Sequence, residues 1–136
     1  MEEGTVEQGE LWPSVNDIER ETVKKLLKRY PKMRRTVDAL TNKSELNDKQ
    51  RQVLREWGGI VAEIDTAFEL ILDEEVKKIF EHRYLKGQRY TSTVNLFWSE
   101  ARSERTIDRR IATGVDTIAE HLKLCGIIEK VAVDWR

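Results

Sequence analysis

The sequence SERTIDRRIATGVDTIAEHL, residues 103–122, decides the fold of this chain. Its apolar residues follow one another at steps of four, four, three and four, which is the spacing of one face of an α-helix. These residues are Ile107, Ile111, Val115, Ile118 and Leu122. Ser103 precedes them and has a hydroxyl that can cap a first turn. The stretch therefore predicts a helix that begins after Ser103 and buries one stripe.

The first two turns of this predicted helix carry charged residues on the face away from the apolar stripe. Arg105, Asp108 and Arg109 stand at positions i, i+3 and i+4, so their side chains share that face. The flanking residues are Glu104, Thr106 and Arg110. Arginine can donate two hydrogen bonds to guanine, and a carboxylate can accept one from cytosine. The amides at a helix N-terminus also favour phosphate, so this helix has the groups that contact DNA.

The composition of the chain favours helices but does not by itself indicate nucleic-acid binding. Of the 136 residues, 36% are charged and 39% are apolar, with two prolines and seven glycines. The net charge is −1, so the protein as a whole is not a polycation. The charge is uneven, because residues 1–75 hold 12 Lys/Arg against 17 Asp/Glu and residues 76–123 hold 10 against 6. The basic excess lies where the predicted helix lies.

Several classes of protein do not fit this sequence. Cys125 is the one cysteine, so a disulfide within the chain and a cysteine cluster for zinc are excluded. His82 and His121 are far apart in the sequence, and we expect no metal site and no cofactor. The chain has no apolar run of membrane-spanning length and no hydrophobic signal core, which predicts a cytoplasmic protein. It lacks a nucleophile elbow, a phosphate loop and an HExxH motif, so we expect no enzyme.

Helices are also predicted along the first half of the chain, after a flexible tail at residues 1–13. Ser14 can cap a helix that Pro31 ends or kinks, and a short helix and a loop follow. A long helix is predicted from about Asn47 to residue 72. The pair Gly58–Gly59 weakens it, and we expect a continuous or kinked helix there. Residues 14–72 thus form an N-terminal helical region that is a candidate for oligomerisation.

Residues 73–128 predict a helix-turn-helix with a supporting helix before it. Asp73 can cap the supporting helix, and Gly87 can end it. A short helix follows in RYTSTVNLFW, residues 89–98, and SEARS, residues 99–103, is a turn. The aromatic and apolar residues expected in the core include Trp57, Phe68, Phe80, Tyr84, Val94, Leu96, Phe97 and Trp98. After Gly126, which can end a helix, IIEKVAVDW, residues 127–135, is a short strand or a docking segment, and residues 129–136 form the C-terminal segment. The predicted fold class is all-α.

Residues 72–122 resemble the promoter-reading C-terminal domain of bacterial sigma factors. RYLKGQRY, Arg83–Tyr90, matches the Arg-Tyr-Leu-x-Gly link of that family, and SERTIDRRI matches its Ser-x-x-Thr-Val-x-Arg-Arg recognition-helix start. The layout is also similar to phage late-gene transcriptional regulators of the ArpU and RinA type, which combine N-terminal helices with a sigma-like motif. Two features depart from the pattern. The turn WSEARSE, residues 98–104, is longer than usual and lacks a glycine, and Gly114 interrupts the recognition helix.

The resemblance implies a sequence-specific double-stranded DNA-binding regulator of transcription, an activator of phage or prophage late genes in the nucleoid of a bacterial host. Arg105, Asp108 and Arg109 would read bases, and Arg110 and Thr106 would fix the register. The further residues expected at the DNA are Ser103, Glu104, Arg89, Thr91 and Arg102. RNA polymerase is the implied protein partner. The sequence leaves a monomer and a homodimer equally open.

Two alternatives compete with this interpretation. A small terminase subunit, which packages DNA, also joins a helix-turn-helix to oligomerising helices, but typically carries the motif toward its N-terminus. A protein-interaction module that has lost DNA binding is the other. Residues 20–35 contain eight basic residues. They form a second DNA-contacting surface or an amphipathic helix balanced by acidic neighbours, and the latter is the simpler interpretation.

Overall fold

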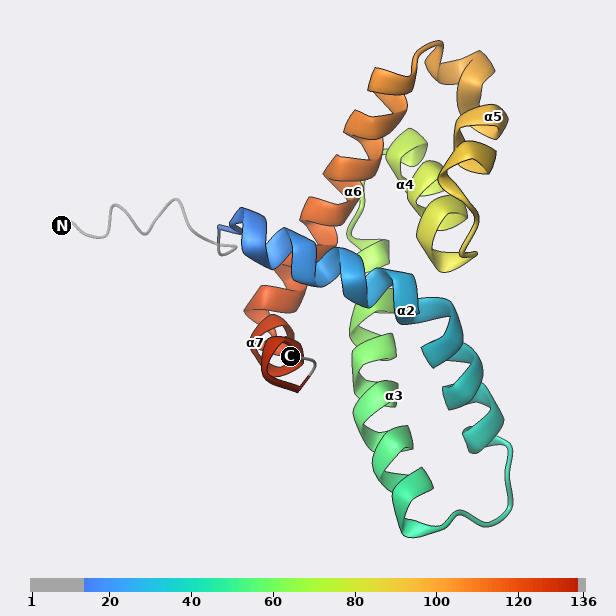
Figure 1. The fold of residues 1–136 in the computed structure, drawn as a ribbon, viewed down its shortest axis with the longest axis vertical. Helices are drawn as coiled ribbons and strands as arrows, with labels where there is room; N and C mark the ends of the chain where they lie inside the picture. The colour runs from blue at the N-terminus through green and yellow to red at the C-terminus, as the bar shows by residue number, and fades with distance from the viewer. Residues whose placement is uncertain (1–13, 135–136) are drawn as a thin grey trace, which may run out of the picture.

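The computed structural model describes residues 14–134, which form helices joined by short turns (Figure 1). The α-helices are α2 (Asp17–Thr41), α3 (Asp48–Glu69), α4 (Glu74–Phe80), α5 (Tyr90–Ala101), α6 (Glu104–Leu124) and α7 (Ile127–Asp134). A π-helical turn, η1 (Glu81–Leu85), continues α4. The described residues contain no strand, which confirms the all-α prediction and corrects the strand suggested after Gly126. The tail predicted at residues 1–13 lies outside the described residues.

Helix α2 begins at a different cap from the predicted one and continues through its proline. Its N-cap is Asn16, not Ser14, because Asn16 and Glu19 form a reciprocal capping box with N···O distances of 2.8 and 2.9 Å. The helix passes through Pro31 to Thr41, so of the two predicted outcomes the proline kinks the helix and does not end it, and no separate short helix follows. It changes direction about halfway along (Figure 1). Proline lacks the amide hydrogen that an interior position donates, so a bend at this point is the expected compromise.

Helix α3 begins where the sequence predicts and runs without a break past its two glycines. Asn47 caps it, and the side chain of Gln50 accepts from the Asn47 amide at 3.0 Å. No atom lies within 4 Å of the position that a Cβ would take on Gly58 or Gly59. No neighbouring helix therefore packs closely against Gly58 or Gly59.

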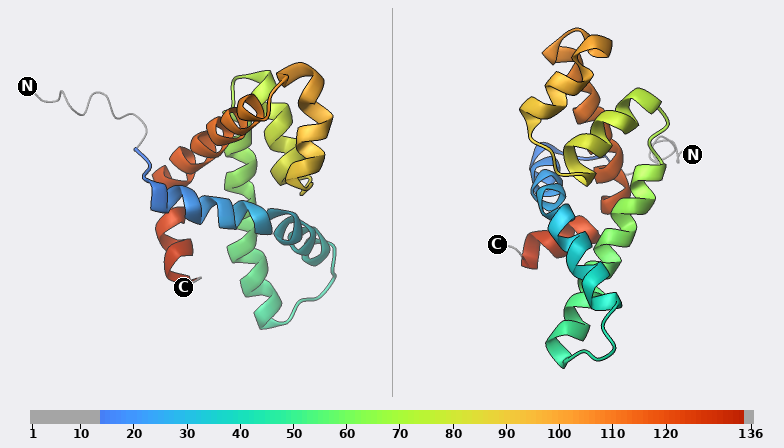
Figure 2. Two further views of the ribbon diagram at one scale, coloured as in Figure 1. Left: turned by 45° about the horizontal axis from the view of Figure 1, so that its top comes forward. Right: turned by 90° about the vertical axis from the view of Figure 1, so that its right-hand side faces the viewer.

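Helix α6 is the centre of the structure, because α2, α3, α4, α5 and α7 all pack against it (Figure 2). The five residues of its predicted stripe are all buried, which confirms the phase of the helix. One core cluster includes Leu26 and Ile64 from the N-terminal helices and Ile79 from the predicted DNA-binding region. The N-terminal helices thus share their core with the helix-turn-helix. Among the described helices, none combines the length and the apolarity that a membrane crossing requires.

Gly114 lies where α6 packs against Phe80 of α4. A Cβ at this position would stand 2.8 Å from Cδ1 of Phe80, and Phe80 is fully buried. Such an approach is shorter than carbon atoms tolerate, so only glycine allows this packing. The unexpected glycine in the predicted recognition helix therefore has a structural cause within the core.

Two of the residues expected in the core are exposed. Leu96 is 59% exposed and Trp98 is 49% exposed, while Phe97 between them is buried. The side that α5 turns inward carries Thr93 instead, whose hydroxyl lies 2.9 Å from Nδ1 of His82. Helix α5 has 12 residues, and only a narrow stripe of them is buried. The periodicity of so short a helix did not show which residues form that stripe.

Candidate nucleic-acid interface

The turn between α5 and α6 is short, contrary to the prediction of a long one. Helix α5 continues to Ala101, so only Arg102 and Ser103 lie between the two helices. Arg102 has a φ of 62°, and its amide donates to the Trp98 carbonyl at 2.7 Å. Glycine usually takes this left-handed conformation, which costs other residues about 1–2 kcal/mol. Arginine replaces it here, which explains why no glycine marks the turn in the sequence.

Ser103 caps α6 as predicted. Its backbone is extended, and its Oγ accepts a hydrogen bond from the Thr106 amide at 3.1 Å. The hydroxyl groups of Ser103 and Thr106 also lie 2.9 Å apart, within hydrogen-bonding distance. Both side chains are half-buried, and their hydrogen bonds stabilise the first turn of the helix. They fix the direction in which the first turn of α6 points.

The first two turns of α6 present a solvent-exposed face. Arg105, Asp108 and Arg109 are all exposed, and Glu104 is exposed beside them. Figure 1 places the α5–α6 turn at one end of the molecule, opposite the loop between α2 and α3. The three residues that the spacing put on one face thus lie together at a protruding edge.

A hydrogen bond that the sequence did not predict joins the two helices of the motif. The hydroxyl of Tyr90, the first residue of α5, donates to a carboxylate oxygen of Asp108 on α6. This bond, with burial as a lesser cause, raises the pKa of Tyr90 to about 12. A carboxylate offers about four acceptor positions, so Asp108 retains capacity for a second donor. Asp108 therefore positions α6 against α5 in addition to any contact with a base.

Arg110 does not lie with the exposed arginines. Its Nη1 stands 3.9 Å from Oε1 of Glu75 on α4, and both atoms are buried without a hydrogen bond. Arg110 follows Ile107 by three residues, which places it at the edge of the buried stripe. The expectation that Arg110 fixes the register on DNA therefore stays a prediction, and its approach to Glu75 makes it less accessible than Arg105 and Arg109.

The remaining candidates lie at the two ends of α5. Arg89 precedes the helix and Thr91 is in its first turn, while Arg102 follows it; all three are exposed. The 12 residues of α5 span about 18 Å, which separates Arg89 from Arg102 along the helix. Arg102 is next to the start of α6, and Arg89 is the more distant contact.

The structure adds basic residues of α2 to the surroundings of this face. A groove of about 410 Å³ separates α2 from the motif, and Lys24, Lys28, Arg83 and Asp108 are among its lining residues. Lys24 donates to Glu21 at 3.3 Å. The basic stretch 20–35 was the feature of the sequence that indicated these residues. The spacing alone did not show which residues of the stretch face α6.

Other basic residues of this stretch form ion pairs with acidic neighbours, as expected if residues 20–35 are part of an amphipathic helix. Arg20 Nε lies 2.7 Å from an oxygen of Asp116 on α6. Arg34 forms an ion pair with Asp65 on α3, which also accepts from the hydroxyl of Tyr30 at 2.5 Å. These pairs hold α2 against its neighbours. The stretch thus contains two arginines, Arg20 and Arg34, that hold α2 against its neighbours, and two lysines, Lys24 and Lys28, that line the groove.

Comparisons with known proteins do not identify the chain. No family model, no curated protein and no solved structure matches it. The geometry of α5 and α6 and the chemistry of the residues that they expose are therefore the basis for a function.

Proposed function

We propose that the chain is a sequence-specific double-stranded DNA-binding protein that regulates transcription, with α6 as its recognition helix. The observation that carries the proposal is the exposed pair Arg105 and Arg109 in the first two turns of α6, directly after a tight turn from α5. In helix-turn-helix proteins the second helix contacts base edges through its N-terminal residues. The major groove of B-DNA, about 12 Å wide, admits one α-helix.

The residues have different roles in this proposal. Arg105 and Arg109 donate to guanine edges, and Asp108 holds α6 in place through Tyr90. Glu104 lies beside them and accepts from a cytosine. Arg102 contacts the phosphates next to the start of α6, while Arg89 and Thr91 contact them near the start of α5. The lysines of the groove, Lys24 and Lys28, add positive charge on the side of α2.

The resemblance of residues 72–122 to the promoter-reading domain of sigma factors supports the regulatory role. It favours promoter DNA of phage or prophage late genes as the target, activation as the effect, and RNA polymerase as the protein partner. A bacterial cytoplasm is the corresponding location. These finer statements depend on the resemblance, whereas the DNA-contacting face depends on the residues of α6.

The proposal is tested by selection from random double-stranded DNA, followed by affinity measurements over a salt series. We expect an enriched motif and an affinity that falls steeply as the salt concentration rises. A palindromic motif indicates a dimer on two half-sites. Salt-sensitive binding without any enriched motif contradicts a sequence-specific regulator and favours DNA packaging. Absence of binding at low salt refutes the DNA function and favours a protein-interaction module.

A further inference from the structure

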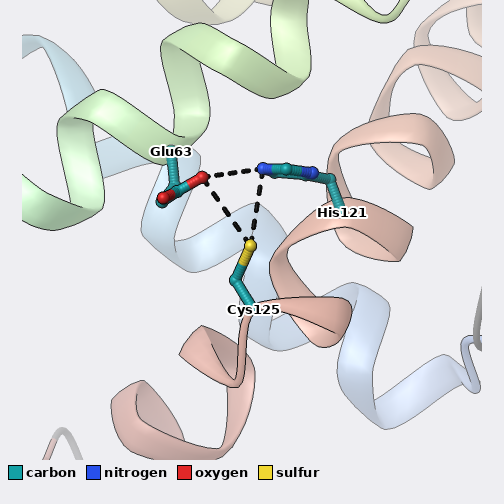
Figure 3. A group of neighbouring side chains, drawn as sticks. All are labelled: Glu63, His121 and Cys125. Atoms are coloured by element: carbon teal, nitrogen blue, oxygen red, sulfur yellow. Dashed lines mark hydrogen bonds and ion pairs between the residues drawn. The ribbon is translucent and has the colours of Figure 1, made fainter.

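Three side chains that can ligate a metal converge where the C-terminal end of α6 meets α3 (Figure 3). His121 Nε2 lies 2.8 Å from Oε1 of Glu63, and Cys125 Sγ lies 3.5 Å from the same nitrogen and 3.7 Å from the same oxygen. Glu63 comes from the second half of α3, and the other two come from the last turn and the C-cap of α6. The sequence did not suggest this group, because Glu63 and His121 are 58 residues apart.

The distances within the cluster match the edges of a tetrahedral zinc site. With bonds of about 2.3 Å to sulfur and about 2.1 Å to nitrogen and oxygen, sulfur lies about 3.6 Å from either other ligand, and nitrogen and oxygen lie about 3.4 Å apart. The two sulfur distances, 3.5 and 3.7 Å, already have these values. The hydrogen bond of 2.8 Å between His121 and Glu63 must open by about 0.6 Å for a cation to enter.

The surrounding helices favour a cation at this position. His121 and Cys125 are four residues apart, so the helix aligns them on one face. The last carbonyl groups of α6 give this end of the helix a partial negative charge. A cavity of about 300 Å³ opens beside the cluster, and it is lined by Glu63, Cys125 and Gly59. Gly59 has no side chain to fill that space, which leaves room for water as a fourth ligand.

We propose that Glu63, His121 and Cys125 bind a divalent transition-metal cation of the Zn²⁺ class, with water as the fourth ligand. A thiolate and an imidazole select Zn²⁺ or a similar cation over Mg²⁺ and Ca²⁺, which prefer oxygen ligands. Arg55 and Lys130 also line the cavity, and Glu56 lies there with Glu63, so the cavity contains two basic and two acidic side chains. The thiol proton leaves for solvent as the cation binds. The site links α3 to α6 and does not depend on DNA binding.

The test is a titration of the full chain with Co²⁺ under reducing conditions, followed by displacement with Zn²⁺. Because Cys125 is the one cysteine of the chain, a thiolate-to-cobalt charge-transfer band can come only from this residue. We expect that band, together with the intense visible bands of tetrahedral cobalt, at one equivalent per chain. Zn²⁺ should then bleach them. Absence of the charge-transfer band overturns the proposal and leaves an ordinary ion pair between His121 and Glu63.

Variants show whether all three residues take part. Cys125→Ser should abolish the charge-transfer band, and its exposed position means that the fold should tolerate the change. Glu63→Gln and His121→Gln should each weaken Co²⁺ binding by at least about 100-fold. Loss of a group that only hydrogen-bonds a metal ligand costs about 10- to 100-fold, so a larger loss indicates direct ligation. The matched control is His82→Gln, whose imidazole bonds Thr93 elsewhere and whose loss should leave the spectrum unchanged. Unchanged affinity in both Glu63→Gln and His121→Gln would reduce the site to adventitious binding by one thiol.

Discussion

Replacing Gly114 by alanine should destabilise the protein, although alanine is the better helix former. The propensity term favours alanine by about 1 kcal/mol in a helix interior. Opposing it, the new methyl would lie 2.8 Å from Cδ1 of Phe80 and 3.2 Å from its Cβ and Cγ. The Phe80 ring is fully buried and packs on Phe68 and Tyr84, with ring centroids 6.2 and 5.3 Å away. It therefore has little room to move.

Overpacking of this kind typically costs about 1–3 kcal/mol, so we expect a net loss of up to about 2 kcal/mol in the free energy of unfolding. Gly58→Ala is the matched control, since Gly58 is also inside a helix but has no atom within 4 Å of its Cβ position. This variant should gain about 0.5–1 kcal/mol. Urea unfolding followed by circular dichroism measures both. Equal stabilisation by the two substitutions would refute the close contact between α4 and α6.

Three further predictions follow from single contacts. Gly87→Ala should destabilise the fold by more than about 1 kcal/mol in urea unfolding, because Gly87 has a φ of +67° and its Cβ would stand 3.0 Å from Cγ of Pro31. A stability equal to that of the wild type would contradict this. Ile111→Ala should cost about 2–5 kcal/mol through the cavity it leaves, and an unchanged melting temperature would place Ile111 on the surface. Tyr90→Phe should remove a pH-dependent contribution to stability. The pKa of Tyr90 is raised from 10.0 to about 12 in the folded protein, so this contribution is complete below pH 10 and is lost as the pH rises toward 12. Unfolding measured from pH 8 to pH 12 should show a smaller decline in the variant, and identical curves would exclude the bond to Asp108.

The helices that could be predicted from the sequence are those whose signals are local and strong. The stripe of α6 repeats over five residues, and Asn47 and Asp73 stand where helix caps are favoured. The failures come from positions where tertiary packing prevailed. The segment after Pro31 belongs to α2 and is not a separate short helix, and Arg102 takes a conformation that usually marks a glycine. The segment of α7 is too short for its periodicity to separate a helix from a strand.

The candidate interface was predictable only in part, for a similar reason. The spacing of Arg105, Asp108 and Arg109 places them on one face, and the structure leaves that face exposed. The spacing of residues in a single sequence shows which residues share a face of one helix, but it does not show which residues of different helices are in contact. The approach of Arg110 to Glu75 and the bond between Tyr90 and Asp108 are of this kind.

The most direct test of α6 as a recognition helix is the affinity of Arg109→Ala for the selected DNA and for random DNA at one salt concentration. We expect a loss of about 1–3 kcal/mol, or about 5- to 150-fold, on the selected sequence and a much smaller loss on random DNA. The matched control is Arg51→Ala, which removes the same charge near the opposite end of the molecule and should leave both affinities unchanged. An equal loss on both DNAs would make Arg109 a phosphate contact. Unchanged affinity for the selected DNA would contradict the assignment of α6 as the helix that reads the sequence.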